Sequence, residues 1–203
     1  MPLNFEEIMA WEMPEVAHAY SRKDTILYAL GLGLGADPVD PGQLGFVYEE
    51  SLRALPTMAA VLAGPGLWFR DPRFGVDWKR VLHGEQGITL HKPLPPEGEL
   101  IGRPRIREIL DKGEKGALIY GEREIRNGGS GELLATVRST TFARGGGGFG
   151  GKSGPTPPVH ELPEGAPEET CDLPTLPQSA LIYRLSGDAN PLHADPGVAR
   201  EAG

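Results

Sequence analysis

Three polar residues near the end of the sequence have the types and spacing of a proton-transfer site. Asp188, Asn190 and His193 lie within six residues of one another, after an apolar stretch at 180–185 and a Ser-Gly turn. An aspartate and a histidine held close together can move protons near neutral pH once their surroundings tune their pKa values. The spacing leaves a second interpretation open, in which Asp188 and Asn190 stabilise turns and His193 is a hydrogen-bonded polar core residue.

A helix is predicted directly after these residues. Asp195 and Pro196 are typical of an N-cap and a first helical position, so the helix should cover residues 198–202, with Gly203 as its C-terminal cap. The polar residues would then lie on a loop that leads to the positive end of a helix dipole. A metal site is not expected, because no third ligand lies at a suitable spacing.

The clearest secondary structure lies upstream, where alternating apolar residues predict four strands separated by short turns. These are residues 87–91, 99–110, 117–126 and 132–144. Because short connections join antiparallel strands, the four should be antiparallel neighbours. A helix N-capped at Asp24 and fraying into Gly31 should pack on one face of the sheet, so the fold class is α+β.

The composition changes after the last predicted strand. Residues 144–158 contain seven glycines and three prolines, and an acidic, proline-rich run follows at 160–170. We interpret residues 153–170 as a linker between two domains, at 1–152 and 171–203. The glycine run is not a phosphate-binding loop, because it lacks the Gly-Lys-Ser/Thr ending at the correct spacing and no helix follows it. A flexible or closely approached backbone is the better interpretation.

Charge and composition exclude several classes of protein. Among 203 residues, 20 Lys and Arg stand against 28 Asp and Glu, and the net charge of −8 argues against nucleic acid or a membrane as partner. Cys171 is the only cysteine, so a disulfide framework is excluded and a buried or incidental thiol is expected. The N-terminus is acidic where a signal peptide is basic, and the longest apolar stretch, 25–36, is too short for a membrane span. A soluble cytoplasmic protein is expected.

The segment at 183–193, YRLSGDANPLH, closely resembles the signature of the (R)-specific 2-enoyl-CoA hydratases, or hydratase 2, within the MaoC-like dehydratases. Five further segments resemble the N-terminal half of that family: 24–33, 46–49, 82–86, 110–113 and 147–152. The resemblance covers nearly the whole chain and implies a double hot-dog fold, in which each antiparallel sheet wraps a long helix. The first half would help to accommodate the acyl chain, and the second would hold the catalytic motif.

The resemblance also implies a reaction. Asp188 and His193 would be the catalytic pair, with Asn190 supporting them. They would activate one water, which adds across the double bond of trans-2-enoyl-CoA to give (3R)-3-hydroxyacyl-CoA in fatty acyl-CoA metabolism. No cofactor is expected, since coenzyme A is part of the substrate.

Three other residues match family positions that contact the acyl-CoA, namely His83, Gly84 and Lys112. A lysine suits a phosphate-bearing ligand, and a solvated turn lysine is an equally good interpretation of Lys112. The expected partner is therefore an acyl-CoA thioester, and the family suggests a homodimer.

The sequence departs from the family at its end. Family members continue past the position of Gly203 with the rest of the second sheet and a His-Gly-Leu-type segment whose glycine N–H is the oxyanion donor. One short strand and one helix cannot complete a hot-dog, so we expect a truncated second repeat, inactive as an isolated 203-residue chain. The alternatives are a non-catalytic acyl-CoA binding or assembly subunit completed by a partner chain, and a dehydratase for a branched or dicarboxylic acyl-CoA.

Overall fold

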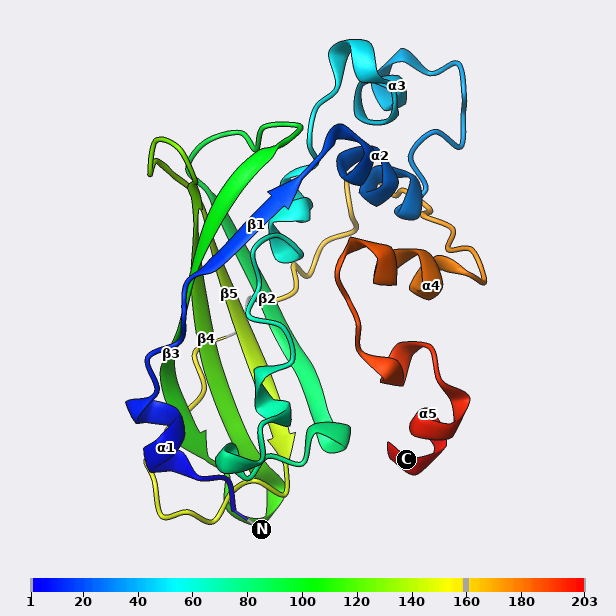
Figure 1. Cartoon of the computed structure of the whole chain (residues 1–203). Coiled ribbons are helices and arrows are strands. Elements are labelled where there is room, and N and C mark those ends of the chain that lie inside the picture. Colours follow the sequence, from blue (N-terminus) through cyan, green and yellow to red (C-terminus); the bar gives the residue numbers. More distant parts are fainter. Residues whose placement is uncertain (1, 159–160, 203) are drawn as a thin grey trace.

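The computed structural model describes residues 2–158 and 161–202 and is built on a five-stranded antiparallel sheet (Figure 1). The strands are β1 (Val16–Tyr20), β2 (Val81–Leu90), β3 (Gly98–Asp111), β4 (Gly116–Asn127) and β5 (Leu133–Arg144). Their order in the sheet is β1-β3-β4-β5-β2. An antiparallel sheet with helices confirms the predicted α+β class, and β1 is a strand that the sequence patterns did not predict.

One predicted strand pairing is wrong. Strands β3, β4 and β5 are consecutive antiparallel neighbours as expected, but β2 pairs with β5 and not with β3, whose other edge is taken by β1. Strand β2 also starts at Val81, six residues earlier than predicted. Reaching β3 from β2 means crossing three strand spacings, about 14 Å, which the intervening residues 91–97 can span. A short connection therefore did not require neighbouring strands.

The helices are short. They are α1 (Phe5–Ala10), α2 (Arg22–Gly31), α3 (Pro41–Val47), α4 (Ser179–Tyr183) and α5 (Pro196–Ala202). Helix α2 begins at Arg22, after Ser21, so Asp24 is not its N-cap as predicted. The Asp24 carboxylate instead accepts hydrogen bonds from the Ser21 N–H (2.8 Å) and hydroxyl (2.6 Å), which lower the pKa of Asp24. Helix α5 follows Asp195 as predicted, and its expected cap Gly203 lies outside the described residues.

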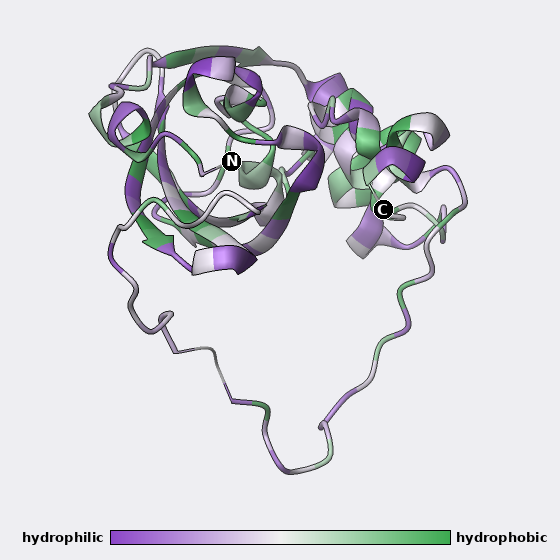
Figure 2. Ribbon diagram, turned by 90° about the horizontal axis from the view of Figure 1, so that it is seen from below, coloured by the Kyte–Doolittle hydropathy of each residue, from purple (hydrophilic) through white to green (hydrophobic). Residues whose placement is uncertain are grey.

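The long helix expected inside the sheet is also absent from the described residues, where α2 with ten residues is the longest helix. Residues 49–80 cover the concave face instead, as a chain of short 3-10 helices around which the sheet curls (Figures 1 and 2). Repeated prolines and glycines in this segment prevent a continuous helix. Met58, Leu62 and Phe74 fill two hydrophobic clusters against the strands, and these clusters form the core.

The glycine run after β5 wraps closely around a buried carboxylate. Asp111, at the end of β3, accepts hydrogen bonds from the backbone N–H groups of Gly148 (2.7 Å), Gly113 (2.8 Å) and Gly150 (2.9 Å). These bonds, that from Gly148 first, lower the pKa of Asp111. A Cβ atom at Gly147 would lie 2.2 Å from the Gly116 carbonyl oxygen. The interpretation of the run as closely approached backbone is confirmed.

The convex face of the sheet has one charged cluster. The Glu122 side chain on β4 is only 4% exposed and accepts hydrogen bonds from Arg105, Arg107 and Arg138 of the neighbouring strands. Burial by itself would raise the pKa of Glu122, but the bonds from Arg105 and Arg138 and the charge of Arg107 lower it to about 2. The cluster thus joins β3, β4 and β5 through side chains.

Beyond the sheet, the described residues between Gly151 and Leu176 form neither helix nor strand, and the middle of this stretch loops away from the body (Figure 2). Cys171 lies in this stretch and is exposed, so the alternative of a buried thiol is wrong. Helices α4 and α5 follow and return to the sheet domain. No helix in the described part of the chain is long and apolar enough to cross a membrane.

A first prediction concerns the glycine run. Replacing Gly147 with alanine should force the backbone away from Gly116 and lower the free energy of unfolding by about 2 kcal/mol or more. At this chain length the melting temperature should fall by about 4–8 °C in a thermal scan. Gly165 is the control, because nothing lies within 4 Å of a Cβ atom there and the same substitution should leave the melting temperature unchanged.

A second prediction concerns acid stability. Because the folded-state pKa of Glu122 (about 2) lies below its ordinary value of 4.5, its stabilisation is complete above about pH 4.5 and disappears as the pH falls to about 2. Glu122→Gln should therefore cost about 1–2 kcal/mol at pH 7 and flatten the pH dependence of unfolding between pH 4.5 and 2. Denaturant titrations at several pH values measure both effects. An unchanged acid profile would contradict this role, and Glu164→Gln, at an exposed position, is the matched control.

Candidate active site

The three polar residues singled out from the sequence lie on the loop between α4 and α5. The apolar stretch before them is helix α4 followed by a 3-10 turn at Arg184–Ser186, so the short strand expected in the second repeat is absent from its described residues. Gly187 then adopts a positive φ of 115°, which reverses the chain and starts the polar loop. A second 3-10 turn, Pro191–His193, ends the loop just before α5.

Asp188 and His193 face each other across this loop. His193 Nε2 lies 3.8 Å from Asp188 Oδ2, and their side chains are 50% and 29% exposed. The separation is longer than a hydrogen bond, as is common at proton-transfer sites without substrate. A water or a substrate atom between the two groups could interact with both. The pair can therefore accept and return a proton at one point in space.

Asn190 holds the loop in shape. Its side-chain oxygen accepts a hydrogen bond from the Leu192 N–H (3.1 Å), and its own N–H donates to Asp188 Oδ1 (3.1 Å). Arg184 donates a further bond to the Asn190 carbonyl oxygen (2.9 Å). These bonds fix the Asp188 carboxylate by one oxygen and direct the other at His193. A supporting role of Asn190 in catalysis stays a prediction.

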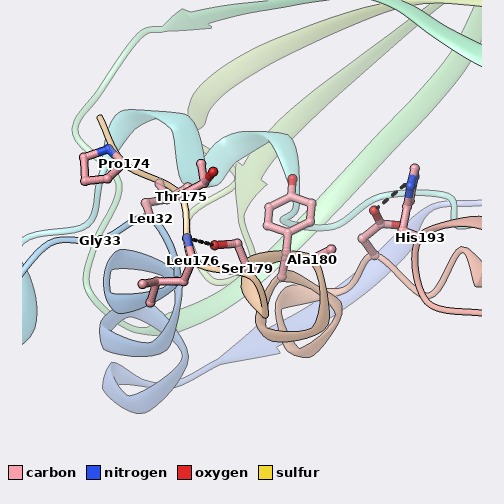
Figure 3. Close-up of a pocket in the computed structure, with 11 residues that line it drawn as sticks. Leu32, Gly33, Pro174, Thr175, Leu176, Ser179, Ala180 and His193 are labelled. Atoms are coloured by element: carbon pink, nitrogen blue, oxygen red, sulfur yellow. Dashed lines mark hydrogen bonds and ion pairs between the residues drawn. The ribbon is translucent and has the colours of Figure 1, made fainter. Parts of the chain in front are cut away.

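A cavity of about 400 Å³ opens beside the pair (Figure 3). Its walls come from two distant parts of the sequence, the end of α2 and the segment that leads into α4. The lining residues are Gly31, Leu32, Gly33, Pro174, Thr175, Leu176, Ser179, Ala180, Tyr183, Asp188 and His193. The wall is largely apolar and the proton-transfer pair is at one end, a combination typical of sites for small organic ligands.

Two contacts seat α4 on α2 and so position the loop. A Cβ atom at Gly31 would lie 3.0 Å from Ile182 Cγ2, so only a glycine allows the two helices to approach this closely without adjustment. One turn earlier along α2, the Tyr28 ring packs at 6.4 Å from the Tyr183 ring. Burial raises the pKa of both tyrosines above the ordinary value.

The α5 end of the segment is held separately. Glu201 forms an ion pair with Lys79 at 2.5 Å, and Lys79 belongs to the chain that enters β2. Hydrogen bonding to Glu201 raises the pKa of Lys79. Both flanks of the polar loop are thus attached to the sheet domain.

The three residues expected to contact acyl-CoA lie outside the cavity lining. His83 and Gly84 are exposed on β2, at a bulge in its pairing with β5. The Lys112 ammonium donates a hydrogen bond to the Gly154 carbonyl oxygen (2.7 Å) and so fastens the start of the linker to the sheet. Contact of these residues with a substrate stays a prediction.

Sequence reasoning missed most of the cavity wall. Gly31, Leu32 and Gly33 belong to a stretch that was assigned only as a fraying helix end, and Pro174 and Leu176 lay next to the predicted linker. One available signal was the run of apolar residues interrupted by glycines, which neither a core helix nor a surface loop explains. Within residues 2–158 and 161–202, no three His, Cys, Asp or Glu side chains converge as metal ligands would.

The chain is similar to several known proteins. Residues 18–145 match the family described as the MFE-2 hydratase 2 N-terminal domain. Enoyl-CoA hydratase ChsH3 of Mycobacterium tuberculosis is 38% identical over all of this chain and 71% of its own length. Peroxisomal enoyl-CoA hydratase 2 of Arabidopsis thaliana is also 38% identical, over 98% of this chain and 70% of its own length.

Among solved structures, the MaoC-like dehydratase of Phytophthora capsici superposes with a TM-score of 0.79 at 31% identity, over 98% of this chain and 70% of that chain. The resemblance drawn from the sequence and the hot-dog fold it implied are confirmed. The family match ends at residue 145, whereas the three matches to individual proteins cover 98–100% of this chain and so include the polar loop as well as the sheet.

The contact between α2 and α4 gives a third prediction. Gly31→Leu should push α4 away from α2, because its side chain would occupy the space of Ile182. Amide hydrogen exchange at residues 179–186 should then speed up by about tenfold or more, while exchange in β4 stays unchanged. Adding Ile182→Ala should restore part of the protection. Equal exchange in the wild type and Gly31→Leu would show that this contact does not seat α4.

Proposed function

The chain belongs to the MFE-2 hydratase 2 family, and we propose that it catalyses the reversible hydration of a trans-2-enoyl-CoA to a (3R)-3-hydroxyacyl-CoA. The observation that supports this most directly is the Asp188 and His193 pair at the end of an apolar cavity. Hydration needs a group that takes a proton from water and returns it, and a pocket for an acyl chain. Both lie together here.

In the proposed reaction, the pair holds one water between Asp188 Oδ2 and His193. One O–H bond of that water breaks as its oxygen bonds to C3 of the substrate, and the proton passes to the pair. The electrons of the double bond move toward the thioester oxygen, giving an enolate that hydrogen-bond donors must stabilise. The same proton then moves to C2. Both parts of one water are thus added to one face of the double bond.

The reverse reaction, dehydration of the 3-hydroxyacyl-CoA, uses the same groups in the opposite order. We propose that neither direction needs a metal or a redox cofactor, because the water carries both the proton and the hydroxide that are transferred. The acyl-CoA thioester is the proposed partner, with His83, Gly84 and Lys112 as further candidate contacts for its polar part. Lys112 would have to release the Gly154 carbonyl oxygen to reach a phosphate.

Three finer points belong to the same proposal. We propose a role in fatty acyl-CoA metabolism, a homodimeric assembly and a cytoplasmic location. The proposed location rests on the composition, with one cysteine and a net charge of −8, whereas the name of the Arabidopsis relative includes the word peroxisomal. Cell fractionation and the mass of the native particle test location and assembly independently of activity.

A fourth prediction tests the catalytic pair in the full-length protein. Asp188→Asn and His193→Ala should each lower kcat for hydration of trans-2-enoyl-CoA by at least about a hundredfold, because each removes one half of the proton relay. The loss of absorbance of the conjugated thioester follows the reaction. Binding of the acyl-CoA, measured by calorimetry, should persist in both variants.

The matched controls are Asp172→Asn, in the exposed stretch before α4, and His91→Ala. The ring of His91 forms a hydrogen bond with Thr136 and does not line the cavity. Both should keep wild-type turnover. Near-normal activity of either catalytic variant would remove that residue from the proposed mechanism. Loss of acyl-CoA binding together with turnover would point to a structural role.

A further inference from the structure

Arg123 is a charged residue on an otherwise apolar face of strand β4. The side chains that share the concave face of this strand with it include Ile119 and Ile125, which are both buried in the core. Burial lowers the pKa of Arg123 to about 10. Its buried Nε has no hydrogen-bond partner among the described residues. A charge in such a place has a cost that an apolar side chain would not have, so it requires a use.

The Arg123 guanidinium binds the end of one 3-10 helix. Its Nη2 donates hydrogen bonds to the carbonyl oxygens of Ala59 (2.9 Å) and Ala60 (3.0 Å), the last two residues of the 3-10 helix Pro56–Ala60. Carbonyl groups at the end of a helix lack partners within the helix, and a basic side chain can supply them. Arg123 thus caps this helix from the sheet.

The chain just beyond this cap is also held against the sheet. Ala63 is buried and adopts a positive φ of 49°, which is uncommon for a residue other than glycine. A Cβ atom at Gly102 of β3 would lie 2.1 Å from the Ala63 carbonyl oxygen, so the two backbones are in direct contact. Val61 therefore lies between two fixed points, the cap made by Arg123 and the contact at Gly102.

Val61 is in turn the neighbour of the polar loop. Its carbonyl oxygen lies 3.7 Å from the place that a Cβ atom would take at Gly187. Gly187 directly precedes Asp188 and accepts a hydrogen bond from the Ala189 N–H (3.0 Å), so a displacement of Gly187 moves the start of the loop. Val61 and Tyr183 of α4 also pack against the same hydrophobic cluster.

These contacts connect the sheet to the catalytic pair, an argument that rests on the proposed function. We infer that Arg123 is a positioning residue for the hydration, which fixes the 3-10 helix so that Val61 supports the loop at Gly187. Arg123 does not line the cavity, so it acts through this backbone path. The path keeps Asp188 opposite His193, and a displacement of about 1 Å at such a site can lower the rate about a hundredfold.

The test measures hydration of trans-2-decenoyl-CoA by the full-length protein, at a temperature at which each variant is folded. Arg123→Met, which removes the charge and the donors, should lower kcat about tenfold and change KM by less than about twofold. Arg123→Lys can still donate to a carbonyl oxygen and should keep kcat within about threefold of the wild type.

The matched control is Arg126→Met. Arg126 lies on the same strand and also donates to a backbone carbonyl oxygen, that of Gly131 in the turn between β4 and β5 (2.9 Å). This bond has no connection to the 3-10 helix, so kcat should change by less than about twofold.

A second readout does not depend on activity. The amide NMR resonances of Asn190 and Leu192 report the shape of the loop, because these N–H groups donate to the side chains of Asp188 and Asn190. Both resonances should move in Arg123→Met and stay in place in Arg126→Met.

Unchanged kcat or unmoved loop resonances in Arg123→Met would overturn the inference, even if the melting temperature fell, because Arg123 would then act on stability alone. Equal losses of kcat in Arg123→Met and Arg126→Met would also overturn it. If Arg123→Met does not fold, Arg123→Gln replaces it with the same expected results, since its shorter, neutral side chain stays polar. A wild-type protein that does not hydrate the ester would contradict the proposed function, and the loop resonances would still decide whether Arg123 positions the loop.

Discussion

The close approach of α2 and α4 is the contact on which the site depends. The polar loop lies far from the sheet in sequence, and the described residues between β5 and α4 form no helix or strand that could place it. Gly31 admits Ile182, and Tyr28 receives the ring of Tyr183, so α4 is held at one rotation and one height on α2. That position decides which side chains of α4 face the cavity and where the loop after it begins. The sheet domain thus positions the loop through this contact and through the ion pair of Lys79 with Glu201 on α5.

The sheet in turn makes α2 a firm base. Thr25 on α2 donates a hydrogen bond to the Pro96 carbonyl oxygen (2.7 Å), in the connection that crosses from β2 to β3. Tyr28 belongs to the same hydrophobic cluster as Met58 and Leu100, so α2, the 3-10 segment and β3 share one core. The unusual connection between β2 and β3 thus has a consequence for function. This connection contains the Pro96 carbonyl oxygen to which Thr25 of α2 donates, and a direct hairpin between β2 and β3 would not place that group beside α2.

Some elements of this arrangement could be predicted from the sequence because they depend on local patterns. The others depend on tertiary contacts. Strands β3, β4 and β5 and the start of α5 depend on local patterns of alternation and capping, and these were predicted closely. The position of β2 depends on which strand edge is free, which no local pattern records. The short strand expected in the second repeat is absent from its described residues, and the apolar run 180–185 instead packs on α2 through Ile182 and Tyr183 of a helix. The cavity wall could not be foreseen, since Gly31 and Leu176 meet only through tertiary contacts.

The two interpretations of the polar loop, as a set of turn caps and as a proton-transfer site, describe the same hydrogen bonds. Asp188 uses Oδ1 to accept the Asn190 N–H and turns Oδ2 toward His193, so the local bond orients the group that would act on water. A carboxylate fixed by one oxygen loses little further freedom when a substrate arrives, which favours the reaction in the manner of any preorganised site. Asn190 is then required for the hydrogen bonds that shape the loop and not for a chemical step. Its side chain must accept from Leu192, and its backbone must donate to Asp188, while neither needs to touch the substrate.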